Sequence, residues 1–274
     1  MPDRKAVLQA GVLMFTLTVD LTEAAVDALG SGNAANRQVQ ILLALHARPG
    51  VTPSQLADSL GMSRSSMSHA LSRFEAEDLV DRSIDKADRR SVRLGLSPKG
   101  SARLRAFEKA LRTVLVRHAD AMRACTGLLG FPAGPDYWST MSVLEAGEGL
   151  GRVGASYVAD VSAAMRPLVA LEWRERFAIT LIHQHGGLRP AALAGSLRMS
   201  SSGTSTLLDR LESLGLVHRT QGADAGDRRA VLVTFTAKGA RSAEAALDVL
   251  ERHAEVLADA MRSALIRQST DGAA

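Results

Sequence analysis

The segment GVTPSQLADSLGMSRSSMSHALSRFEAEDLVDR, residues 50–82, decides the fold because it occurs twice in the chain. Residues 187–219 read GLRPAALAGSLRMSSSGTSTLLDRLESLGLVHR, and the constant offset between the copies is half of the 274-residue chain. A period this long is typical of a duplicated domain, since solenoid repeats are only about 20–50 residues long. We therefore expect two domains, residues 1–130 and 137–274, joined by a linker at 131–136 within a stretch rich in proline and glycine.

Each copy carries the pattern of two helices separated by a tight turn. In the first copy, Thr52 and Pro53 are typical of a helix start, because threonine caps free backbone N–H groups and proline needs no partner at the first helical position. Gly61 ends this helix, and Ser63 caps the next one, whose apolar residues recur at helical spacing. This order is the helix-turn-helix arrangement. The helix after the turn is termed the reading helix below.

A short hairpin, the wing, is expected to follow each helix-turn-helix. The predicted strands lie at residues 79–83 and 91–96 in the first copy and at 216–220 and 230–236 in the second. Long helices are predicted at residues 6–29, 98–124, 148–165 and 237–266. The predicted fold class is mainly α with small β-wings (α+β), with two tandem winged helix-turn-helix domains and long helical flanks of the dimerisation type.

The composition is that of a globular protein, with 46% hydrophobic and 23% charged residues. The single cysteine excludes an internal disulfide framework. With no evident secretory signal and no run of about 18 apolar residues, a cytoplasmic protein is expected. The net charge of +4 is compatible with a polyanionic partner without identifying one, and the low aromatic content of 4% argues against a protein that stacks single-stranded bases.

The reading helices predict contact with double-stranded DNA. The major groove of B-DNA admits one helix, whose exposed residues read base edges. Both reading helices open with small hydroxyl residues, which allow a close approach and leave the helix N-terminus free for a phosphate. The expected contacts on these helices are Ser63, Arg64, Ser65, Ser66, Ser68, His69 and Arg73 in the first copy and Ser200, Ser201, Ser202, Thr204, Ser205 and Arg210 in the second.

The wings supply further basic residues. A guanidinium at a hairpin tip can enter the minor groove or clamp phosphates. The expected wing contacts are Arg82, Lys86, Arg89, Arg90 and Arg93 in the first copy and Arg219, Arg228 and Arg229 in the second. Asp88 and Asp227 are expected to hold these arginines in position. A serine-rich helix start is often only a cap and a basic hairpin only a solvated loop, but their recurrence at matching places in two copies favours DNA.

These motifs resemble those of the MarR-type regulators. The pattern in that family is Leu-Glu…Gly-Leu-Val-x-Arg, a wing with Asp-x-Arg, and Leu-Thr-x-x-Gly opening the next helix. The second copy matches it at residues 211–219, 227–229 and 235–239, whereas the first has Asp78 in place of the glycine. The resemblance covers about residues 36–105 and 172–245. It implies transcriptional control, usually repression, and often release by a small ligand.

Typical members of that family are homodimers of one such unit, whose terminal helices interleave. Because this chain carries two units, we expect an intramolecular pseudo-dimer whose reading helices reach successive major grooves. The two reading helices differ in sequence, so the expected operator is an imperfect palindrome. Further homodimerisation stays open.

Other candidate sites have competing interpretations. Cys125 is expected to be inert rather than an oxidant sensor, and the His183-x-His185 pair to serve the core or a helix end rather than a metal. An aromatic effector pocket competes with ordinary core packing at Tyr137, Trp138, Tyr157 and Trp173. No catalytic motif is recognised, so neither an enzyme, a cofactor nor a metal is expected. The rival to a DNA regulator is a winged-helix adaptor that binds a protein partner.

Overall fold

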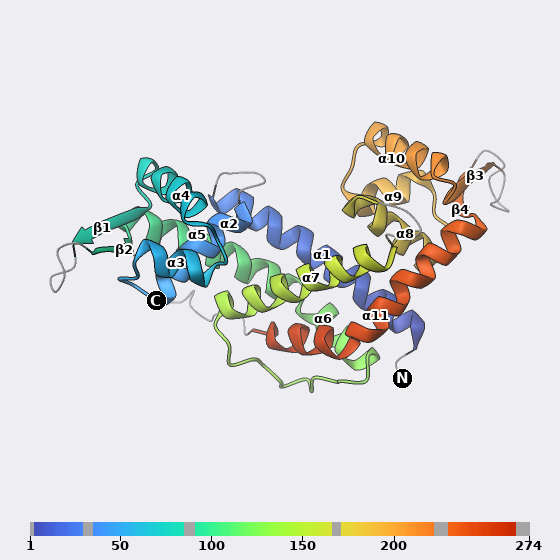
Figure 1. Cartoon of the computed structure of the whole chain (residues 1–274). Coiled ribbons are helices and arrows are strands. Elements are labelled where there is room, and N and C mark those ends of the chain that lie inside the picture. Colours follow the sequence, from blue (N-terminus) through green and yellow to red (C-terminus); the bar gives the residue numbers. More distant parts are fainter. Residues whose placement is uncertain (1–2, 30–34, 85–90, 166–170, 222–229, 267–274) are drawn as a thin grey trace. The chain divides into compact units, whose positions relative to one another are not determined.

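A computed structural model describes residues 3–29, 35–84, 91–165, 171–221 and 230–266 (Figure 1). The first repeat contains α1 (Arg4–Leu29), α2 (Ala35–Ala47), α3 (Pro53–Ser59), α4 (Arg64–Ala76), β1 (Val80–Ile84), β2 (Val92–Leu96), α5 (Pro98–Arg117) and α6 (Ala119–Leu128). The second contains α7 (Val143–Met165), α8 (Trp173–His185), α9 (Pro190–Leu197), α10 (Ser201–Ser213), β3 (Val217–Gln221), β4 (Val231–Phe235) and α11 (Ala237–Ser263). The predicted fold class is confirmed: helices dominate, and the strands form antiparallel pairs.

The flanking helices differ from the prediction in two places. The single helix expected at residues 98–124 is wrong, because the backbone leaves the helical region at His118 (φ −98°, ψ 3°) and separates α5 from α6. Helix α7 begins at Val143, earlier than predicted, and Ser142 and Glu145 form reciprocal hydrogen bonds at its start. The hydrogen bonds from Ser142 also lower the pKa of the Glu145 carboxyl.

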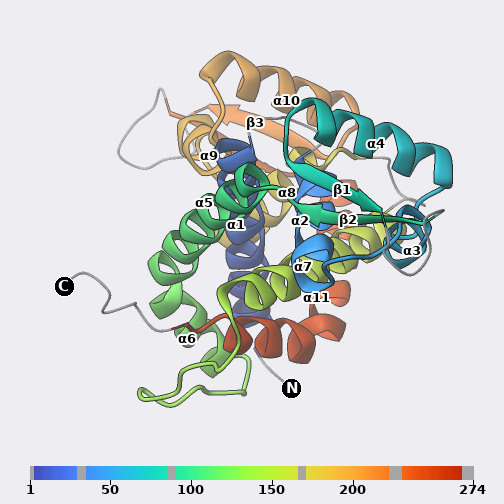
Figure 2. The same cartoon turned by 90° about the vertical axis from the view of Figure 1, so that its left-hand side faces the viewer.

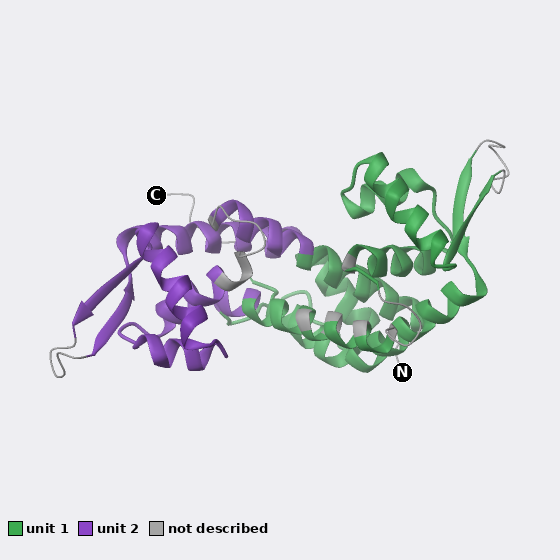
Figure 3. Cartoon of the chain, turned by 45° about the horizontal axis from the view of Figure 1, so that its top comes forward, with its two compact units in different colours: residues 1–18, 118–141, 148–274 green, residues 19–117, 142–147 purple. Residues whose placement is uncertain are grey.

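The chain forms two compact units whose limits differ from those of the sequence repeat (Figure 3). Unit 1 contains residues 1–18, 118–141 and 148–274, and unit 2 contains residues 19–117 and 142–147. Unit 1 thus holds the second winged helix together with the start of α1 and all of α6, which come from the first repeat.

The winged helix of unit 2 consists of α2, α3, α4, β1 and β2. Thr52 and Gln55 form a capping box at the start of α3, with Thr52 Oγ1 accepting from the Gln55 N–H at 3.3 Å. The predicted apolar face of the reading helix α4 is buried at Met67, Leu71 and Phe74. This helix lies alongside β1, as Figure 2 shows.

The winged helix of unit 1 repeats this arrangement with α8, α9, α10, β3 and β4. The reading helix α10 buries Leu207, Leu208 and Leu211. In each unit, one residue before the helix-turn-helix adds a short bridge to the second wing strand: Val51 pairs with Leu94, and Leu188 pairs with Val233. These bridges fasten each wing to its helical core.

Within unit 1, the ends of the first repeat pack on the last helix of the second repeat. Arg4 forms ion pairs with Glu244, Asp248 and Glu251 of α11 at 3.0, 3.0 and 2.9 Å. Helix α6 packs on α11, and Gly11 of α1 lies so close to Leu250 that a β-carbon there would collide with it. These contacts tie both repeats into one compact unit.

Residues 4–28 of α1 form a helix long and apolar enough, by length and composition, to cross a membrane. Half of the helix's most apolar window is buried inside the structure, as in the core helix of a globular protein.

A close backbone approach requires glycine at the start of α5 and of α11. A β-carbon on Gly100 would meet the carbonyl oxygen of Leu79, and one on Gly239 would meet that of Leu216. The first turn of α5 or α11 therefore rests directly on the residue that precedes the first wing strand, which explains the glycine that recurs in both copies.

Two of the positions at which both copies have a positive φ carry glycine in one copy only. The turn between helices uses Gly61 (φ 60°) and Arg198 (φ 49°), and the second residue after the reading helix is Asp78 (φ 58°) or Gly215 (φ 68°). Non-glycine residues pay a steric cost in this region.

The substitution Asp78→Gly should raise the free energy of unfolding by about 1 kcal/mol, because it removes part of the roughly 1–2 kcal/mol cost of a left-handed L-residue. The matched control Gly215→Ala should lower it by about 1 kcal/mol. Urea unfolding of both full-length variants measures these changes. A neutral or destabilising Asp78→Gly would contradict the strain at this position.

Candidate nucleic-acid interface

The first reading helix presents a polar surface that begins at its N-terminus. Ser63 caps α4, accepting a hydrogen bond from the Ser66 N–H at 3.1 Å. The side chains expected to face DNA are all exposed: Ser63, Arg64, Ser65, Ser66, Ser68, His69 and Arg73. The small hydroxyls and the free N–H groups of the first turn therefore lie on one accessible end of the helix, next to Arg64.

The second reading helix presents hydroxyls with less basic charge. Ser200 caps α10 and accepts from the Gly203 N–H at 3.1 Å, and Ser201, Ser202 and Ser205 are exposed. The expectation for Thr204 is wrong, since its side chain is only 1% exposed and donates to the Ser200 carbonyl at 3.0 Å. Thr204 occupies the place of Met67 in the first copy and faces the core.

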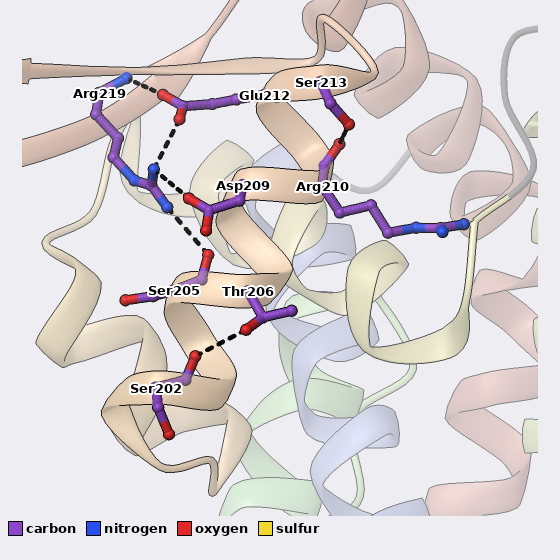
Figure 4. A network of polar contacts seen from close by, with 8 residues as sticks. All are labelled: Ser202, Ser205, Thr206, Asp209, Arg210, Glu212, Ser213 and Arg219. Carbon is purple, nitrogen blue, oxygen red and sulfur yellow. Dashed lines mark hydrogen bonds and ion pairs between the residues drawn. The ribbon is translucent and has the colours of Figure 1, made fainter.

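Thr206 is an exposed residue of this surface that the sequence prediction missed. It lies at the place of His69 in the first copy, so the repeat offset alone could have identified it. Its hydroxyl donates to the Ser202 carbonyl at 3.1 Å (Figure 4).

The arginines late in the reading helices have carboxylate partners. Arg73 pairs at 3.1 Å with Glu77, the residue that follows the end of α4. Arg210 extends to the side of α10 opposite Arg219 (Figure 4) and pairs with Glu175 of α8. The Glu175 side chain is only 5% exposed, and it also accepts the Glu172 N–H at 2.7 Å. Among basic side chains of α4 and α10, Arg64 and His69 are those with no ion pair to a described residue.

The wing arginines that the structure describes are also held by the protein. Arg82 pairs with Glu75 of its reading helix. Arg219 pairs with Asp209 and Glu212, each at 2.7 Å (Figure 4). Arg93 donates to the Gly50 carbonyl at 3.0 Å. The remaining predicted wing residues lie outside the described residues: Lys86, Asp88, Arg89, Arg90, Asp227, Arg228 and Arg229.

Cys125 and the paired histidines lie apart from the reading helices. Burial raises the pKa of the Cys125 thiol, which keeps it protonated and weakly nucleophilic. His183 lies 3.7 Å from Glu244 of α11. In the described part of the chain, no three His, Cys, Asp or Glu side chains lie close enough together to hold a metal ion.

Two of the candidate aromatic residues have described side chains, and both of these contact arginines. Arg123 lies over the Trp138 ring at 5.2 Å, and Arg262 over the Tyr137 ring at 5.7 Å. The side chains of Tyr157 and Trp173 lie outside the described part of the structure.

Comparison with solved structures finds similar chains of regulators. A transcriptional repressor, CouR, bound to a 23-mer DNA duplex is 29% identical, with 39% of this chain and 71% of that chain covered and a TM-score of 0.33. Wild-type MarR from E. coli is 22% identical, with 40% and 78% covered and a TM-score of 0.33. A MepR variant from S. aureus bound to an oligodeoxyribonucleotide is 23% identical, with 42% and 89% covered and a TM-score of 0.35. The comparison with curated proteins gives no match.

Comparison with family models gives a match to each repeat. A model of the MarR family matches residues 34–91, which contain α2 to β1, and a second model of the same family matches residues 171–231, which contain α8 to β3. Both matches therefore cover a helix-turn-helix and the start of its wing. Each winged helix is therefore matched by a model of the MarR family, and the chain is a tandem MarR-type winged-helix regulator.

Proposed function

We propose that this regulator binds a specific site in double-stranded DNA through both winged helices and acts as a repressor, the role that the family resemblance implies. The observation that carries the proposal is the exposed N-terminal end of α4. There, Arg64 and His69 stand beside four serine hydroxyls, and neither forms an ion pair with a described residue. A helix end of this kind can enter a major groove with its N–H groups toward a phosphate.

The two winged helices would contribute unequally to affinity. The first reading helix offers an arginine and a histidine to base edges or phosphates, and arginine is the most frequent reader of guanine. The second offers serine and threonine hydroxyls, while its Arg210 is engaged by the buried Glu175. We therefore assign most of the electrostatic attraction to the first winged helix, the one that contains α4, and an imperfect palindrome follows as the preferred site.

The intramolecular pseudo-dimer is supported by the contacts inside unit 1. The start of α1 and all of α6 pack with α11 of the second repeat, and Arg4 is held by three carboxylates of α11. These are the terminal helices of the two repeats, which correspond to the dimerisation helices of single-unit members of the family. One chain would then provide the pair of winged helices that two chains provide in single-unit members of the family.

Three further expectations stay predictions. Release of DNA by a small aromatic effector is one, with Tyr137 and Trp138 as the described candidates. A cytoplasmic location and the lack of an enzymatic activity are the others. The alternative function, a winged-helix adaptor for a protein partner, uses the same surfaces. It predicts that Arg89, Arg90, Arg228 and Arg229 can be replaced by alanine without loss of function.

Replacing Arg64 and His69 together by glutamine should weaken binding to the preferred duplex at least about tenfold, because a good base contact is worth roughly 1–3 kcal/mol. The duplex is first selected from a random DNA pool, and affinity is then measured at several salt concentrations. The control Arg241→Gln removes one exposed positive charge from α11, away from the reading helices, and should leave the preferred sequence unchanged. Selection of no preferred duplex by the wild-type chain would favour the adaptor.

Analytical ultracentrifugation should detect a single 29.0 kDa chain that binds one duplex containing both half-sites. The physical reason is that the terminal helices already find their partners within the chain. A protein that sediments only as two chains, with the repeats of each chain separated, would contradict the pseudo-dimer. A selected site with two equivalent half-sites would contradict the unequal reading helices.

A further inference from the structure

Arg219 connects the second wing to its reading helix through several hydrogen bonds (Figure 4). Its Nη1 donates to Asp209 Oδ1 and to Glu212 Oε2, each at 2.7 Å. Its Nη2 donates to the Ser205 carbonyl at 3.1 Å, and its backbone N–H donates to Glu212 Oε1 at 2.8 Å. One residue of β3 thus contacts three residues of α10.

The three partners lie on one side of the reading helix. Ser205, Asp209 and Glu212 are spaced by four and three residues, the spacing that places residues on the same helical face over a length of about 10 Å. The guanidinium fork can reach such a row because its donors are rigid and planar. The Arg219 side chain is only 27% exposed, so most of its surface faces the protein rather than an approaching phosphate.

The first copy has a simpler version of this connection. Arg82 of β1 pairs with Glu75, the counterpart of Glu212, and its side chain is 41% exposed. Ser72 stands where the second copy has Asp209, so the second carboxylate is missing. The two wings are therefore fastened to their reading helices by different numbers of contacts.

We infer that Arg219 is a positioning residue, which fixes the wing against the reading helix through Asp209 and Glu212 and does not itself contact DNA. The inference rests on the proposed function, because the positioned wing and helix would occupy adjacent grooves. Asp209 makes the second winged helix the more rigid reader, whereas the first wing has more freedom to adjust. Arg82 performs the same task with one carboxylate.

The experiment compares Arg219→Lys, Arg219→Gln and Arg82→Lys in the full-length chain. Lysine keeps the charge but cannot reach Asp209, Glu212 and the Ser205 carbonyl together, so Arg219→Lys should weaken binding to the selected duplex about tenfold. The slope of log affinity against log salt should stay unchanged in Arg219→Lys and Arg219→Gln. Arg82→Lys should change affinity less, because lysine can replace a single ion pair.

A phosphate contact predicts the reverse pattern. Arg219→Lys would then bind as the wild type does, and Arg219→Gln would reduce the salt slope by about 1. Either result would overturn the inference. Thermal unfolding of each variant identifies any global loss of folding.

Hydrogen exchange tests the same connection without DNA. Arg219→Lys should speed exchange in residues 217–221 and 231–235 of the second wing and leave the first wing unchanged. Equal exchange in wild type and variant would overturn the inference. If the wild-type chain selects no duplex, the proposed function fails, while the exchange measurement still decides whether Arg219 holds the wing.

Discussion

The architecture depends on the packing of the first repeat's terminal helices against α11. Unit 1 is built around this contact, in which Arg4 meets a row of carboxylates and Gly11 accommodates Leu250. Without it, the apolar residues at the start of α1 that are buried in unit 1, such as Val7, Ala10 and Leu17, would be exposed. Burial within unit 1 makes the apolar face of α1 part of a protein core. Because both repeats contribute to this core, they do not form two independent domains.

Local signals in the sequence predicted most of each winged helix. Thr52 and Ser63 cap the helices that they were expected to cap, since capping depends on a few neighbouring atoms. The break at His118 could not be predicted, because neither proline nor glycine marks it and the apolar spacing continues. The early start of α7 had a signal, Ser142 with Glu145 three residues later, that matches a capping box. The compact units could not be read from the repeat, because they depend on contacts between distant helices.

The sequence predicted which residue types form the candidate site better than it predicted which of their side chains are buried or paired. Exposure of the first reading helix followed from its spacing, whereas Thr204 was misplaced because a hydroxyl residue can take a core position when it bonds to its own helix. The roles of the arginines were harder to predict. Arg73, Arg82, Arg210 and Arg219 all pair with carboxylates, and such partners become visible only when the helices are packed. Basic residues near a reading helix thus divide into those that face outward and those that form ion pairs within the protein.

The covalent link between the two winged helices also has a consequence for how the protein responds to its own abundance. Two separate subunits must first associate, so their joint occupancy of a site falls steeply on dilution. Two winged helices in one chain stay together at any concentration, and the second meets DNA at the high local concentration set by the first. The DNA occupancy of a regulator built in this way would rise in direct proportion to its expression level. Such a regulator would also not form mixed dimers with related proteins in the same cell.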